Sequence, residues 1–83
     1  DGDQFAKAAE SVQKGLKRGG VKRPDQARLV LGMSYFNMGE YNKARPAFRD
    51  AGKDERSEKY SKQWIKYIAS EEQRQIELQK DIF

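Results

Sequence analysis

The chain has 83 residues, of which 36% are charged and 36% hydrophobic, with a net charge of +4 and neither histidine nor cysteine. This length allows one small domain or part of a larger one; disulfides and thiolate metal sites are excluded, and the commonest general base and metal ligand is missing. Because few apolar residues must be buried among many charges, we expect an all-α fold of amphipathic helices, with no segment that inserts into a membrane.

The first segment, residues 4–18, is predicted to be a helix because its apolar residues recur at spacings of three and four. They are Phe5, Ala8, Ala9, Val12 and Leu16. Asp3 is expected to cap the start of this helix, and Gly19 with Gly20 is expected to end it.

VKRPDQ is predicted to be a connection, and the segment DQARLVLGMSYFNM is predicted to be a second helix that ends at Met38. Pro24 fits its first turn, although Asp25 could instead be the cap. Two apolar stripes overlap on it, and a helix that is apolar on two sides contacts neighbours on both. One stripe holds Ala27, Leu31, Tyr35 and Met38, and the other holds Leu29, Met33 and Phe36. Gly39 is the expected stop.

A third helix is predicted over about residues 41–52. Its apolar positions are Tyr41, Ala44, Phe48 and Ala51. Proline inside a helix removes one backbone hydrogen bond and clashes one turn back, so Pro46 predicts a bend or a loosened first turn. Gly52 is expected to end the helix.

The last segment lacks glycine and proline, which predicts a long helix from about Ser57, the expected cap. One face carries Tyr60, Trp64, Tyr67, Ile68 and Glu71, and a second carries Ile65, Ala69, Glu72 and Ile76. The apolar stripe fades after Ile68, so the remainder is expected to be solvated. Short links between all four helices predict that successive helices are antiparallel neighbours.

An internal repeat relates the helices at a constant offset of 36 residues, as from Phe5 to Tyr41. The segment DQFAKAAESVQKG aligns in this way with GEYNKARPAFRDA. The same offset carries Leu29 to Ile65 and therefore links the second helix to the fourth. The repeating unit is thus predicted to be a pair of helices.

The complete unit reads Arg28-x-x-Leu31-Gly32-x-x-Tyr35 and then Ala44-x-x-x-Phe48. This resembles the tetratricopeptide repeat (TPR) pattern W-x₂-L-G-x₂-Y…A-x₃-F, whose unit has about 34 residues. We place the two extra residues of this chain in the loop KRGGVKRPD. The family's tryptophan position holds Arg28 here and Trp64 in the last helix, and Arg56 lies near the place of its terminal proline. Small residues such as Gly32 are expected to let neighbouring helices approach closely.

The resemblance implies a TPR-like α-solenoid within a single domain, residues 1–83. Residues 3–20 would be the second helix of a partial repeat, residues 24–53 a complete repeat, and residues 56–80 a capping helix, because terminal repeats are atypical. The chain therefore resembles the C-terminal end of a longer array. It is similar to TPR proteins of the bacterial cell envelope, some encoded beside TonB-type uptake systems, which implies a periplasmic location.

The resemblance also implies a scaffold for protein–protein interaction. In TPR proteins the first helix of each pair lines a concave groove that binds a peptide or protein segment. The matching positions here are Gln26, Leu29, Met33, Phe36, Asn37, Lys62, Ile65, Ala69 and Gln73. Leu29, Met33 and Phe36 form an apolar patch, which could line the groove or be buried against a neighbouring helix or a dimer mate. Leu29 and Met33 stand where some TPR domains clamp a carboxylate with lysine and asparagine, so chaperone-tail binding is not expected.

Two alternative functions stay open. One is a structural or oligomerising module of a larger array, which in isolation would form a homodimer or a domain swap. The other is an RNA-binding accessory role of a basic cluster that lacks interleaved aromatic residues; its members are Lys14, Lys17, Arg18, Lys22 and Arg23. Glu71 and Glu72 diverge by about 100° on a helix, so they do not form a catalytic pair. No enzyme activity, cofactor, metal or small-molecule substrate is predicted.

Overall fold

The protein, seen in a computed structural model that describes residues 2–82, is all-helical. Its elements are α1 (Gly2–Arg18), α2 (Pro24–Asn37), α3 (Tyr41–Ala51), the short 3₁₀ helix η1 (Glu55–Ser57) and α4 (Glu58–Ile82). No strand occurs within this range. The predicted all-α class and the four helices are therefore confirmed.

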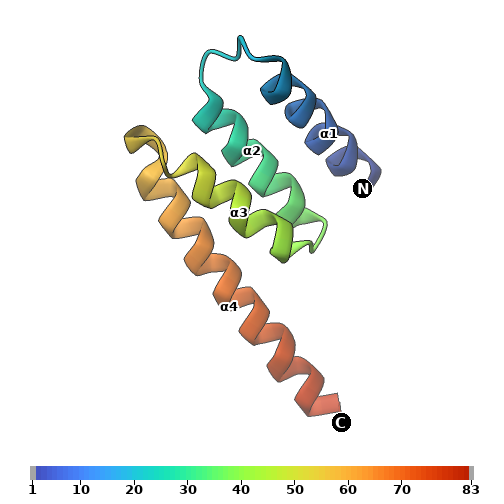
Figure 1. Ribbon diagram of the computed structural model, residues 1–83. Helices are drawn as coiled ribbons and strands as arrows, with labels where there is room; N and C mark the ends of the chain where they lie inside the picture. Colours follow the sequence, from blue (N-terminus) through green and yellow to red (C-terminus); the bar gives the residue numbers. More distant parts are fainter. Residues whose placement is uncertain (1, 83) are drawn as a thin grey trace.

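The helices lie side by side in chain order, and each packs against the next (Figure 1). Their Cα atoms span 50 × 29 × 14 Å, so the molecule is a thin slab in which every helix keeps a solvent-facing side. The second half of α4 extends past the other helices (Figure 1). No helix among the described residues has both the length and the hydropathy needed to cross a membrane.

The helix ends follow the glycines, with some differences from expectation. Gly19 and Gly39 have φ values of 78° and 75°, a left-handed conformation that favours glycine, and they follow α1 and α2 as predicted. Pro24 is the first residue of α2, so Asp25 is not its cap. The expectation for Asp3 was wrong, because α1 begins at Gly2 and Asp3 lies inside its first turn.

Two features of α3 need a different explanation from the one its sequence suggested. The helix continues without interruption across Pro46, which lies on the exposed side, where water can reach the carbonyl that loses its partner. Gly52 ends α3, but with φ of −71° it does not need glycine for its backbone angle. A Cβ at Gly52 would lie 2.6 Å from the Ser61 Oγ atom, so glycine is required there by the close approach of α4.

Two small cores hold the slab together. The first joins α1, α2 and α3 through Ala9, Leu31 and Ala47. The second is centred on Ala44 and Phe48 of α3 and Ile68 of α4, all three with no exposed surface. It joins α2 as well, because half-buried residues of α2 pack against it. Tyr35 packs against both cores. Because α3 contributes alanines to each core, its neighbours can approach it closely.

Gly32 is a point of close approach between α2 and α3. A Cβ at this position would lie 2.7 Å from the Cε1 and Cζ atoms of the Phe48 ring. The Phe48 ring is in turn stacked on Trp64, with ring centroids 5.2 Å apart and planes 6° apart. The predicted close approach at Gly32 is therefore confirmed, and it extends through Phe48 to α4.

Candidate partner-binding surface

The second apolar stripe of α2 is shared between the core and the surface. Leu29, Met33 and Phe36 are half-buried, and they pack against the core that joins α2, α3 and α4. Ile65 of α4 is half-buried against the same core. We call these four residues the apolar strip. The structure thus brings together the four largest apolar residues of the predicted groove, each with one side in the core.

The polar residues predicted for the groove lie on the exposed surface. The Asn37 side-chain amide donates to the Met33 carbonyl oxygen at 2.8 Å, so it turns back onto its own helix. Gln73 donates to Glu77 at 3.4 Å, one turn further along α4. Gln26 and Lys62 are exposed as well. Of the predicted groove residues, the fold therefore packs the large apolar ones against one core and leaves the polar ones outside it.

A shallow hollow of about 610 Å³ lies along α4, and we call it the α4 hollow. It is lined by Lys59, Lys62, Gln63, Ile65, Lys66 and Ala69. Ile65 belongs both to this hollow and to the apolar strip, so the two are continuous. The lysine side chains expose aliphatic stems below their ammonium groups, and such stems line apolar surface well.

Five aromatic rings connect the C-terminal half of α2 to α4. Phe36 is the centre, with ring centroids 5.5 Å from Tyr41, 5.4 Å from Trp64 and 5.2 Å from Tyr67. Trp64 stacks on Phe48 on its other side. Aromatic pairs at such distances stabilise beyond the area that they bury. Phe36 therefore fixes α4 against α2 in addition to contributing to the apolar strip.

A buried charge network holds the N-terminus of α2 against η1, and sequence analysis missed it. Asp25, only 2% exposed, accepts from the Arg23 Nε and Nη2 atoms at 2.9 and 2.7 Å and from the Ser57 Oγ atom at 2.6 Å. The Arg23 hydrogen bonds, followed by that of Ser57, hold the pKa of the Asp25 carboxyl well below its usual range. The Ser57 hydroxyl, expected to cap α4, instead donates to this carboxylate.

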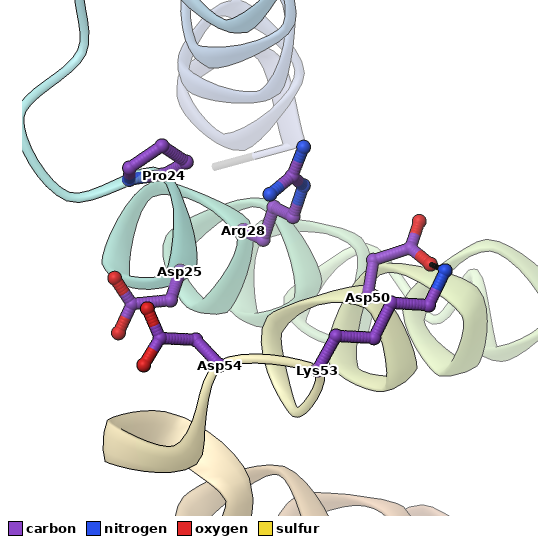
Figure 2. A pocket seen from close by; sticks show the side chains of 6 residues that line it. All are labelled: Pro24, Asp25, Arg28, Asp50, Lys53 and Asp54. Carbon is purple, nitrogen blue, oxygen red and sulfur yellow. Dashed lines mark ion pairs between the residues drawn. The ribbon is translucent and has the colours of Figure 1, made fainter.

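The network borders a second hollow of about 460 Å³, lined by Pro24, Asp25, Arg28, Asp50, Lys53 and Asp54. Figure 2 shows Asp25 and Asp54 beside the same space and Lys53 reaching toward Asp50. All three carboxylates have cationic partners: Asp25 pairs with Arg23, Asp50 with Lys53, and Asp54 with Arg56. Within residues 2–82 no group of three acidic, histidine or cysteine side chains is placed to hold a metal ion. The three carboxylates at this hollow are therefore already engaged within the chain.

The Asp25 network predicts acid sensitivity. Because the folded-state pKa of Asp25 lies below its unfolded value of about 3.9, its stabilisation is present above that pH and is lost as the pH falls toward the folded-state pKa. We expect the urea midpoint of the wild-type protein to fall on acidification below about pH 4. Asp25→Asn should be less stable at neutral pH and should show a flatter dependence on pH in this window.

The matched control for this pH titration is Glu10→Gln, which also removes one carboxylate but lies on α1, away from the network. A variant Asp25→Asn whose midpoint follows pH as steeply as the wild-type midpoint would contradict the role assigned to Asp25.

The two alternative sites of the sequence also have defined surroundings. Glu72 pairs with Arg45 of α3, and Glu71 lies 4.0 Å from Arg74, so the adjacent carboxylates point to different partners. In the basic cluster, Lys14 pairs with Glu10 and Arg23 with Asp25. Two of the five cations of that cluster are therefore already engaged within the chain.

Comparison with known proteins identified no relative of this chain. No protein-family model matches the chain, and no curated protein or solved structure is significantly similar to it. Function must therefore be argued from the geometry of the apolar strip and the α4 hollow.

Proposed function

We propose that the chain is a TPR-type helical module, without catalytic activity, that binds a segment of another protein along the apolar strip. One observation carries the proposal: half-buried apolar residues of two helices that are distant in sequence form one continuous surface. Leu29 and Ile65, 36 residues apart, pack against the same core and keep one side exposed. Continuous apolar surface of this kind is typical of interaction sites.

The repeat assignment is supported by similar burial at some aligned positions, whereas Leu31 is buried and its aligned residue Tyr67 is 48% exposed. Gly32 and Ile68, which the 36-residue offset aligns, are both buried. Asp25 is 2% exposed and its aligned residue Ser61 is 3% exposed. A helix pair that is repeated in space would place aligned residues in similar surroundings, and the residues of these two aligned pairs are similarly buried. The bacterial envelope origin remains part of this proposal and rests on the sequence resemblance alone.

A structural or oligomerising role is the second candidate, and one observation favours it. Beyond Glu72 the residues of α4 from 73 to 80 are all exposed. Ile76 and Leu78 in this stretch are 48% and 49% exposed. Exposed apolar side chains on a helix that extends past its neighbours can be covered by a second copy of the chain.

Peptides selected from a displayed random library against the protein test the proposal. We expect Met33→Glu to weaken the selected peptides about tenfold or more, because it places a charge in the apolar strip. Leu78→Glu also replaces an apolar residue by glutamate, but on the side of α4 away from Ile65, and it should leave binding unchanged. Circular dichroism of both variants checks that they are folded. Selected peptides that bind Met33→Glu as tightly as the wild-type protein would refute this site.

A further inference from the structure

We propose that the segment bound here is acidic and amphipathic: its apolar side chains fill the α4 hollow, and its carboxylates contact Lys59, Lys62 and Lys66. This inference rests on the proposed function and adds the chemistry of the partner. It comes from two properties of the same surface, an apolar lining and a rim of one charge sign.

The apolar part of the argument is the shape of the hollow. Its volume of about 610 Å³ lies within the range of about 300–1,000 Å³ that ligand pockets occupy. Ile65 and Ala69 are one helical turn apart and line it together with the stems of the lysines. A purely polar ligand would leave this lining exposed to water, whereas a leucine-sized side chain would cover it.

The charged part of the argument is the rim. Three of the six lining residues are lysines, and none is acidic. Among the described residues, Lys62 is the only one of these three lysines that forms an ion pair, with Glu58 at 3.3 Å. The side chains of Lys62 and Glu58 are both largely exposed. Exposed pairs of this kind are weak and exchange easily with other partners. Lys43 and Lys53, by contrast, form ion pairs with Glu40 and Asp50.

The two properties together favour an acidic peptide over a nucleic acid. A nucleic acid would use the lysines but needs aromatic faces on which its bases stack. No ring lines the hollow. Of the rings next to its lining residues in sequence, Trp64 and Tyr67 contact Phe36. Tyr60 is 57% exposed but is not among the lining residues. An acidic amphipathic peptide uses both the cations and the apolar lining. Its charges would chiefly speed association and set specificity, while its apolar residues would supply affinity.

Synthetic peptides with leucines at fixed positions and glutamate, glutamine or lysine at all others test this inference. Isotope-labelled protein is titrated with each peptide, and the affected amides and dissociation constants are measured by NMR at low and high salt. We expect the glutamate peptide to bind about tenfold tighter than the glutamine peptide at low salt. This advantage should shrink at high salt, because exposed charges are screened.

Charge reversal on the rim gives the decisive variant. Lys66→Glu should remove the preference for the glutamate peptide and shift it toward the lysine peptide, which loss of folding could not do. Lys7→Glu makes the same change in net charge on α1 and serves as the matched control. It should keep the preference of the wild-type protein.

The outcomes separate this inference from the proposed function. Equal binding of the glutamate and glutamine peptides, with shifts at Met33 and Ile65, would overturn the acidic partner and leave the binding surface standing. Absence of shifts with every peptide would overturn both. Shifts of the hollow residues with polyuridylate but with no peptide would assign the surface to nucleic acid. Concentration-dependent shifts at Ile65 without any ligand would assign it to a second copy of the chain.

Discussion

Truncation of Phe48 to alanine is expected to lower the free energy of unfolding by about 3–5 kcal/mol. The hydrophobic cores of so small a domain rarely supply more than about 3–5 kcal/mol in total, so most of the variant should be unfolded at 25 °C. The reason is the position of the ring. Phe48 has no exposed surface, lies against Gly32 of α2 and stacks on Trp64 of α4, so it joins three helices at once.

Urea unfolding followed by circular dichroism measures this effect. Tyr60→Ala is the matched control, because it also removes an aromatic ring but from a side chain that is 57% exposed. Surface substitutions of this kind usually change stability by less than about 0.5 kcal/mol. A Phe48→Ala variant that unfolds at the same urea concentration as Tyr60→Ala would show that α2, α3 and α4 are held together elsewhere.

Sequence periodicity and glycine placement account for most of the fold. Apolar spacing located all four helices, and the glycines at 19, 20 and 39 marked the ends of α1 and α2 because their positive φ is easily adopted only by glycine. Gly52 also marked the end of α3, although its role is steric. Such local signals suffice in this chain because its helices follow one another through short links.

Contacts between distant residues could not be predicted in the same way. Asp25 and Ser57 are 32 residues apart, and each alone reads as an ordinary capping residue. Only the packing of η1 beside the start of α2 brings them within hydrogen-bonding distance. Arg23 lies only two residues from Asp25, but Arg56 of η1 comes near the same carboxylate only through the fold.

The binding surface was partly predictable for the same reason. Periodicity places Leu29, Met33 and Phe36 on one side of α2, but it does not say how much of that side the next helix covers. Contacts with the second core and the aromatic rings of α4 decide this, and they leave the strip half-exposed. The α4 hollow was not predicted, because it depends on how Ile65 is turned between the core and the lysines.

Replacing Gly32 by leucine is expected to lower the free energy of unfolding by about 1–3 kcal/mol, through overpacking rather than through loss of contacts. Even the first added carbon would lie 2.7 Å from the Phe48 ring. That ring cannot move aside easily, because Trp64 is stacked on its far side. For a domain of 60–100 residues each 1 kcal/mol corresponds to about 4–8 °C in melting temperature, so the effect is measurable by thermal unfolding.

Gly15→Ala is the control for the change of residue type, because a Cβ at Gly15 would lie 3.8 Å from Val21, an ordinary contact. Alanine is the better helix former by up to about 1 kcal/mol, so this variant should be stabilised. The clash itself is tested by combining Gly32→Leu with Phe48→Leu. A smaller side chain at 48 leaves room for the new one, so the double variant should be more stable than the sum of the two single effects predicts. Strictly additive effects would mean that Gly32 is required for some reason other than its contact with Phe48.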